Sequence, residues 1–199
     1  MTNLIIISSP EVIENEESMV NTLFDNGLEL FHLRKPGYTE TEICRYLEKI
    51  KPEYIEKVSI HQHHQVAEKF NIRYLHFKEA NINEVENYSK LSGKLFSTSC
   101  HSLKDVENLP KIFDYCFLSP VFDSISKKGY LGKFDKDFSI NTYQEKNVKG
   151  CVRHIFALGG INESNIKEVF ERGFYGAALL GYIWEDTKES LKKFKNVKM

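Results

Sequence analysis

The stretch IFALGGINESNIKEVFERGFYGAALLGYIW, Ile155 to Trp184, decides the fold. An apolar run, Ile155 to Leu158, is followed by two glycines and then by a segment whose apolar residues recur at helical spacing. A second apolar run, Ala177 to Leu180, ends at Gly181. The stretch therefore predicts a buried parallel strand, a crossover helix and a second strand, which is the repeating unit of α/β folds.

Both of these strands end in glycine where a helix begins. Gly159 and Gly160 follow the first strand, and Gly181 follows the second. Glycine lets backbone N–H groups approach a ligand closely, and the positive end of a helix dipole favours an anion. The two turns together predict a phosphate site, although the glycine pair is also compatible with a turn requirement alone.

Six further apolar runs precede this unit, and helical spacing or turn residues separate them. The strands are expected at 4–7, 28–33, 58–60, 72–77, 94–98, 115–118, 155–158 and 177–180. Thr39 and Glu42 predict a capping box, Ser102 a second helix start, and 139–144 a return helix. Eight alternating strands favour an α/β fold of the closed (β/α)8 TIM barrel type over a doubly wound sheet, and the first turn, SSPEV, lacks a Rossmann glycine fingerprint.

Length and composition restrict the class of protein. The 199 residues, 41% of them hydrophobic, show no shift in composition, so a single domain over 1–199 is expected, with shorter loops than in typical barrels of about 250 residues. A net charge of −1 argues against nucleic-acid or anionic-membrane partners. The first apolar run is too short for a signal peptide or a membrane span, which favours the cytoplasm. Four scattered cysteines predict neither a disulfide framework nor a zinc ribbon.

In such a barrel the carboxyl ends of the strands and the loops after them share one rim. The residues expected there are mostly cations, hydroxyls and glycine amides, the groups that bind phosphate. They are Arg34, Lys35, His61, Gln62, His63, His76, Lys78, Ser99, His101, Ser119, Ser124, Ser126, Lys127, Gly159, Gly160 and Gly181. Carboxylates are scarce at this rim.

Each group also has a simpler interpretation. Arg34 and Lys35 are compatible with ordinary surface charge, and the long loop after residue 118 with a solvated excursion. His61, His63 and His64 suggest a metal only weakly, because HQHH has neither the helical i,i+4 spacing nor a nearby carboxylate. We therefore predict no metal ligand from this string.

Five strings in this order resemble the thiamine phosphate synthase family and its relative, the thiazole tautomerase TenI. The resemblance extends nearly from end to end and is specific because each string falls on the expected strand. The strings are LFHLRKP at 30–36, FSTSCHS at 96–102, FDYCFLSPVFDSISKKGY at 113–130, IFALGGI at 155–161 and GAALLGYI at 176–183.

The resemblance implies a transferase of thiamine biosynthesis, commonly a homodimer, that joins hydroxymethylpyrimidine diphosphate to a thiazole phosphate and releases pyrophosphate with the help of Mg²⁺. Carried over by position, the expected catalytic residues are Arg34, Lys127 and Ser99, which would hold the pyrophosphate with Ser124 and Ser126. Gly160, Leu180 and Gly181 would take the thiazole phosphate. Lys35, His61, Gln62, His101, Ser119 and Gly159 complete the expected substrate-binding set.

The chain departs from the family pattern at three points. Pro36 occupies the lysine position after the second strand, with Lys35 one place early. His61 and Gln62 replace an Asn-Asp pair after the third strand, and Ala80 stands near a second expected aspartate, so the Mg²⁺ ligands are absent. The tautomerase histidine in the turn after the sixth strand is replaced by Ser119 and Pro120. Two alternatives therefore stay open: a TenI-like isomerase that uses His61 or His101 as its base, and a non-catalytic barrel that binds a phosphorylated metabolite.

Overall fold

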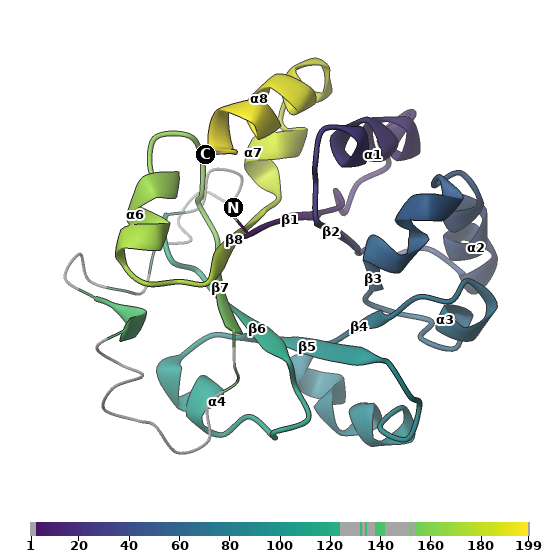
Figure 1. Ribbon diagram of the computed structural model, residues 1–199, viewed down its shortest axis with the longest axis horizontal. Coiled ribbons are helices and arrows are strands. Elements are labelled where there is room, and N and C mark those ends of the chain that lie inside the picture. The colour runs from purple at the N-terminus through teal and green to yellow at the C-terminus, as the bar shows by residue number, and fades with distance from the viewer. Residues whose placement is uncertain are drawn as a thin grey trace.

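The computed structural model describes residues 3–123, 132, 134, 138–141, 152 and 154–198. Eight parallel strands hydrogen-bond in sequence order, and β8 pairs with β1 to close a barrel. The strands are β1 (Asn3–Ile7), β2 (Leu30–Leu33), β3 (Val58–Ile60), β4 (Tyr74–Phe77), β5 (Leu95–Cys100), β6 (Tyr115–Leu118), β7 (His154–Leu158) and β8 (Gly176–Leu179). Figure 1 looks down this ring of strands. The predicted (β/α)8 TIM barrel is confirmed.

Helices surround the barrel (Figure 1). They are α1 (Glu16–Asp25), α2 (Glu40–Glu48), α3 (Val66–Lys69), α4 (Leu103–Glu107), α6 (Ile166–Glu171), α7 (Gly181–Trp184) and α8 (Ser190–Val197), with 3₁₀ segments η1 (Pro52–Lys57), η2 (Glu79–Asn87) and η3 (Thr187–Glu189). The connection from β4 to β5 contains the 3₁₀ segment η2 and no α-helix, in keeping with its polar sequence. Half of the return helix expected at 139–144, residues 142–144, lies outside the described residues. Within the described ranges, no helix is both long and apolar enough to cross a membrane.

Local chemistry sets the element boundaries. The predicted capping box is present, since the backbone N–H of Thr39 donates to Glu42 Oε2 at 2.8 Å and the N–H of Glu42 donates to Thr39 Oγ1. The second strand begins at Leu30 and not at Leu28, because the N–H of Leu28 donates back to the carbonyl of Leu23 and ends α1. The fifth strand is longer than expected, because its last residues, 99 and 100, pair with β6.

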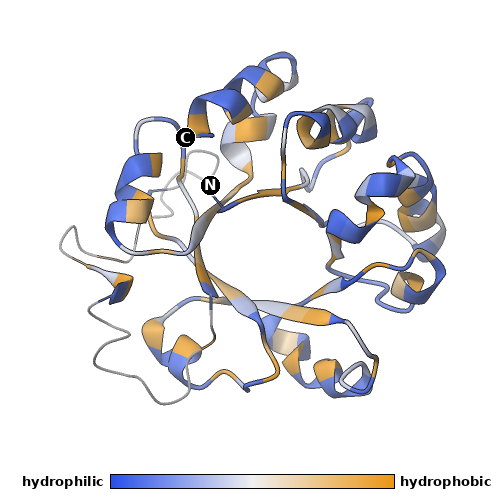
Figure 2. Ribbon diagram, in the orientation of Figure 1, coloured by the Kyte–Doolittle hydropathy of each residue, from blue (hydrophilic) through white to orange (hydrophobic). Residues whose placement is uncertain are grey.

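Two hydrophobic clusters fill the molecule. The larger lies between the strands and the helices, and Figure 2 shows the apolar colour on the strands and on the helix faces turned toward them. The smaller lies inside the barrel and is built mainly from Ile5, Ile7, Leu30, Tyr115, Phe117, Phe156 and Ala178. Strand alternation turns His32, Ser59, His76 and Ser97 inward as well. The polar side chains of the interior therefore come from β2–β5, and the apolar ones come mainly from β1 and β6–β8.

Candidate functional site

A cavity of about 560 Å³ opens at the carboxyl ends of the strands. Loops after strands far apart in sequence contribute to it, as expected for a barrel of this kind. Nine of the predicted site residues line it: Arg34, His61, Ser99, His101, Ser119, Gly159, Gly160, Leu180 and Gly181. His76 and Lys78 line it as well. The structure thus gathers most of the predicted rim around one opening.

Two residues of the predicted substrate-binding set, Lys35 and Gln62, lie elsewhere, and both corrections have a local cause. The ammonium of Lys35 lies 2.6 Å from Glu16 Oε2 and donates to the carbonyl of Glu11, so this side chain is turned toward α1 and away from the cavity. The amide of Gln62 donates to the carbonyl of Lys35. Neither residue belongs to the cavity lining. Ser124, Ser126 and Lys127 lie outside the described residues.

Arg34 is positioned by the loop that follows β1. Its backbone N–H donates to Ser8 Oγ at 2.7 Å, and the Ser8 hydroxyl donates to the Arg34 carbonyl at 2.9 Å. Ser8 is fully buried, so this pair of bonds fixes the start of the β2 loop from the interior. The described lining residues include two permanent cations, Arg34 and Lys78, and one carboxylate, Glu79. The balance of charge favours an anionic ligand.

The glycine pair after β7 has a packing role of its own. Gly159 and Gly160 have φ values of 99° and 67°. A Cβ atom on Gly159 would lie 2.9 Å from Pro120, and one on Gly160 would lie 2.8 Å from Phe122. The loop after β6 crosses these glycines closely, with the N–H of Phe122 donating to the Gly159 carbonyl. The glycines are therefore required by this crossing, whether or not they also contact phosphate.

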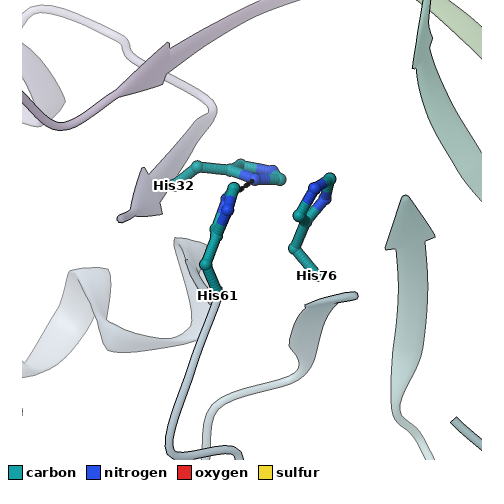
Figure 3. A group of neighbouring side chains, drawn as sticks. All are labelled: His32, His61 and His76. Carbon is teal, nitrogen blue, oxygen red and sulfur yellow. Dashed lines mark hydrogen bonds between the residues drawn. The ribbon is translucent and has the colours of Figure 1, made fainter. Parts of the chain in front are cut away.

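Three histidines from adjacent strands meet at the floor of the cavity (Figure 3). His32 lies on β2, His76 on β4, and His61 directly follows β3. His32 Nδ1 is 2.9 Å from His61 Nε2, and the rings of His61 and His76 stack with centroids 4.0 Å apart. We call these residues the histidine cluster. His61 and His76 reach the cavity lining, whereas His32 lies beneath them.

Burial determines the charge of the histidine cluster. Desolvation, with a smaller contribution from His76, holds the pKa of His32 well below 6.5. Desolvation followed by the neighbouring His76 does the same to the pKa of His61. Desolvation lowers the pKa of His76 to about 3. All three imidazoles are therefore neutral at neutral pH, and each offers one lone pair.

The sequence interpretation missed this cluster. It grouped His61 with His63 and His64, but His63 Nε2 lies 2.9 Å from the Tyr38 carbonyl and His64 Nε2 lies 3.0 Å from the His76 carbonyl. Those two rings hydrogen-bond to backbone carbonyls and are not part of the group around His61. Side-chain alternation along β2 could have placed His32 in the site, because His32 stands two residues before Arg34 and so points to the same side of the strand.

His101 stands beside the turn after β6. Its Nδ1 is 3.2 Å from the Ser119 carbonyl oxygen and 3.4 Å from the Ser119 hydroxyl oxygen. Its backbone N–H donates to Asp105 on α4. The loops after β5 and β6 are thus joined at the rim of the cavity, and the imidazole adds a proton-carrying group there.

A second cavity, of about 710 Å³, lies at the amino ends of the strands. Its lining is rich in aromatic rings, among them Tyr74, Tyr115, Phe156 and Tyr175. Although it is the larger of the two, barrels of this architecture carry their chemistry at the carboxyl ends. The described residues among those predicted to bind phosphate also line the cavity there. We therefore assign the site to the smaller cavity.

Fold and site together define a (β/α)8 barrel with a cationic, glycine-bearing pocket at the carboxyl ends of its strands. The family model described as thiamine monophosphate synthase matches residues 4–183. The chain belongs to this family, which places it in thiamine biosynthesis.

Individual relatives agree with this membership. A thiamine-phosphate synthase of Limosilactobacillus reuteri is 25% identical over 190 residues, which cover 89% of this chain and 86% of that protein. A thiamine phosphate pyrophosphorylase structure from Bacteroides thetaiotaomicron superposes with a TM-score of 0.78 at 28% identity, over 98% of this chain and 95% of the other. One from Pyrococcus furiosus, at 18% identity and a TM-score of 0.73 over 100% and 98% of the two chains, shares the fold.

Proposed function

We propose that this protein joins hydroxymethylpyrimidine diphosphate to a thiazole phosphate and releases pyrophosphate, giving thiamine phosphate. One observation supports this most strongly: in a member of the thiamine monophosphate synthase family, the described residues among those predicted to bind phosphate line one cavity. They are Arg34, Ser99, Gly160, Leu180 and Gly181. A cavity of about 560 Å³ lies within the range of small-molecule sites, roughly 300–1,000 Å³.

The two phosphorylated substrates would occupy opposite sides of the cavity. Arg34, after β2, and Ser99, on β5, would hold the diphosphate, together with Ser124, Ser126 and Lys127 from the segment outside the described residues. Gly160, after β7, and Gly181, at the start of α7, would take the thiazole phosphate through backbone amides. This division places the two substrates across the barrel mouth from each other.

The chemistry needed from the protein is mainly electrostatic. When the C–O bond between the pyrimidine methylene carbon and the diphosphate breaks, its electron pair leaves with the diphosphate. The ring nitrogen of the thiazole then gives its lone pair to the methylene carbon. Arg34 offers a planar fork to the leaving oxygens, and Lys78 adds positive charge at the same rim. Groups fixed before the reaction stabilise charge where it develops.

Mg²⁺, which the family resemblance implies, does not fit the protein groups of the described site. The ion prefers oxygen ligands in near-octahedral geometry. Glu79 is the one carboxylate among the described lining residues, Ala80 has no ligand atom in its side chain, and Gln62 is directed at a backbone carbonyl. The described lining residues therefore do not form a Mg²⁺ site of protein ligands.

A second candidate is an isomerase of the thiazole tautomerase kind. The observation in its favour is the position of His101, whose Nδ1 lies 3.2 Å from the carbonyl of Ser119, at the turn where the tautomerase histidine is expected. An imidazole at this point could take a ring proton from a thiazole bound nearby. A non-catalytic barrel would bind the same phosphates without converting them.

One experiment separates these functions. Purified protein is mixed with both synthase substrates and Mg²⁺, and thiamine phosphate and pyrophosphate are measured in the same samples. Equal amounts of the two products, rising with enzyme concentration, are expected. If neither forms, isomerisation of the thiazole carboxylate phosphate is followed next, and failure there as well leaves the binding function. Arg34→Ala should abolish product formation, whereas Arg73→Ala, at the amino end of β4, should not.

A further inference from the structure

The histidine cluster has a composition that the proposed transfer reaction does not require. His32, His61 and His76 each have a ligand nitrogen within 4.8 Å of those of the other two, and all three side chains are buried. Because burial keeps the imidazoles neutral, lone pairs are available without loss of a proton. Neutral imidazole is the commonest metal ligand in proteins.

We propose that His32, His61 and His76 form a binding site for one divalent transition-metal ion that prefers nitrogen ligands, such as Zn²⁺ or Co²⁺. Three imidazoles with a fourth position open to solvent or substrate is the ligand pattern of an accessible zinc site. Because His61 and His76 line the cavity and His32 lies beneath them, this site is at the cavity floor. The proposal stands on these side chains and does not depend on the transferase activity.

The outer nitrogens already have partners that would orient the rings. His32 Nε2 lies 2.7 Å from the Tyr115 hydroxyl, and His76 Nδ1 lies 2.9 Å from Ser97 Oγ. The other ring nitrogens, Nδ1 of His32 and Nε2 of His76, would bind the ion in place of their present contacts with His61 Nε2 and Ser99 Oγ. Hydrogen bonds to the outer nitrogen of a ligating histidine fix its tautomer and orientation, and they raise its basicity.

Metal binding requires a modest rearrangement of the histidine cluster, in which one pair of nitrogens moves slightly apart and the others move closer. Metal–nitrogen bonds of about 2.0–2.1 Å at tetrahedral angles place ligand nitrogens about 3.3 Å apart. His32 Nδ1 and His61 Nε2 are 2.9 Å apart, and the widest separation in the cluster is at most 4.8 Å. Rotation of the His76 ring, which gives up its 3.2 Å contact with Ser99 Oγ, would supply the remaining movement.

The choice of metal follows from the donor atoms. The hard cation Mg²⁺ takes oxygen ligands, whereas imidazole suits Zn²⁺, Co²⁺ and their neighbours. Three neutral ligands leave the ion its full charge of +2. An ion at the cavity floor would therefore attract phosphate oxygens into its open position, on the same side of the barrel as Arg34.

The test uses tag-free, full-length protein that has been stripped with a chelator and then freed of it. Co²⁺ is added stepwise, and the visible absorption of tetrahedral cobalt is recorded. We expect bands that saturate at one ion per chain and disappear when Zn²⁺ is added. Absent bands, or a linear increase without saturation, would overturn the proposal.

A matched pair of variants assigns the ligands. His61→Asn removes one of them, and His63→Asn makes the same substitution two residues away, at a left-handed position with φ 54° that asparagine tolerates. Loss of a residue that only hydrogen-bonds to a ligand typically weakens metal binding roughly 10- to 100-fold, and we expect a loss in this range for Tyr115→Phe. We expect His61→Asn to weaken Co²⁺ binding more than this, and His63→Asn to leave it unchanged. Equal losses in both histidine variants would place the metal elsewhere.

X-ray absorption of the zinc-loaded wild-type protein covers the case in which His61→Asn does not fold. Three imidazole nitrogens at about 2.0–2.1 Å are expected. A shell of oxygen or sulfur alone would contradict the proposal. These measurements need no turnover, so the two proposals can fail separately. A protein that binds cobalt but makes no thiamine phosphate would disprove the proposed function and support the metal site. A protein that makes thiamine phosphate but binds no cobalt would disprove the metal site and support the proposed function.

Discussion

The ammonium nitrogen of Lys35 lies 2.6 Å from Oε2 of Glu16, and the two side chains are 1% and 2% exposed. This buried ion pair joins the loop after β2 to the start of α1. Glu16 also accepts from the backbone N–H of Ser9, so the loops after β1 and β2 are held together. The backbone that carries Arg34, next to Lys35 in sequence, is therefore held in place beside the cavity.

Breaking this pair should destabilise the protein strongly. Lys35→Met leaves the Glu16 carboxylate buried without a counter-charge, at a cost of about 3–5 kcal/mol of unfolding free energy. Lys51→Met is the control, because Lys51 pairs with Asp25 at the surface and should cost less than about 1 kcal/mol. Urea unfolding measures both. Equal effects would mean that the buried pair is not coupled as the geometry indicates, and the double variant Lys35→Met/Glu16→Leu should recover part of the loss.

Three glycine substitutions separate backbone strain from steric conflict. Gly37→Ala meets no atom within 4 Å and should be nearly neutral. Gly93→Ala also has space, but its φ of +77° should cost about 1–2 kcal/mol. Gly160→Ala adds a contact of 2.8 Å to Phe122 and should cost more than Gly93→Ala. Thermal unfolding ranks them, and a Gly160→Ala protein as stable as Gly37→Ala would show that the β6 loop does not cross this glycine as described.

The role of Arg34 can be measured by binding alone. Arg34→Ala removes charged hydrogen bonds worth about 1.5–3 kcal/mol, so the affinity for pyrophosphate should fall roughly 10- to 150-fold. Arg34→Lys should recover only part, because an ammonium cannot form the planar fork. Calorimetric titration with pyrophosphate gives both values. The exposed Arg73, at the other end of the barrel, provides the control, and a similar loss in Arg73→Ala would show a nonspecific charge effect.

Acid should destabilise the metal-free protein before its surface carboxylates titrate. Because the histidine cluster stays neutral when folded, with the pKa of His76 lowered to about 3, the unfolded chain takes up protons first as the pH falls below 6.5. The unfolding free energy is thus unaffected by these histidines at pH 7. It decreases as the pH falls below 6.5, by up to about 1.4 kcal/mol per pH unit for each histidine. Burial raises the pKa of Glu16, which offsets part of this effect.

Urea unfolding between pH 7.5 and 5 would record this slope. His76→Gln should reduce the slope by up to about 1.4 kcal/mol per pH unit, since one histidine no longer titrates in the unfolded chain. A slope of zero in the wild-type protein over this range would mean that the three rings are solvated or charged when folded.

Much of the fold could be predicted because its determinants are local. The apolar runs at 4–7 and 155–158 are largely buried, as parallel strands require, and turn residues mark their ends: Ser8 to Pro10 after the first and two glycines after the second. The boundary at Leu28 could not be predicted, because an apolar residue that ends α1 resembles one that begins a strand. The site was harder. Arg34 and Lys35 are adjacent cations, and only their contacts with Ser8 and Glu16 reveal that one faces the cavity and the other α1. The histidine cluster depends on barrel closure and strand register, which no single stretch encodes.

The measurement that tests the central claim most directly is a crystal structure of the protein soaked with pyrophosphate and thiazole phosphate together. We predict pyrophosphate beside Arg34 and Ser99, and the thiazole phosphate beside Gly160 and Gly181, within the same cavity at the carboxyl ends of the strands. Phosphate density in the cavity at the amino ends, or a carboxyl-end cavity that stays free of both ligands, would contradict the proposed site and the function that rests on it.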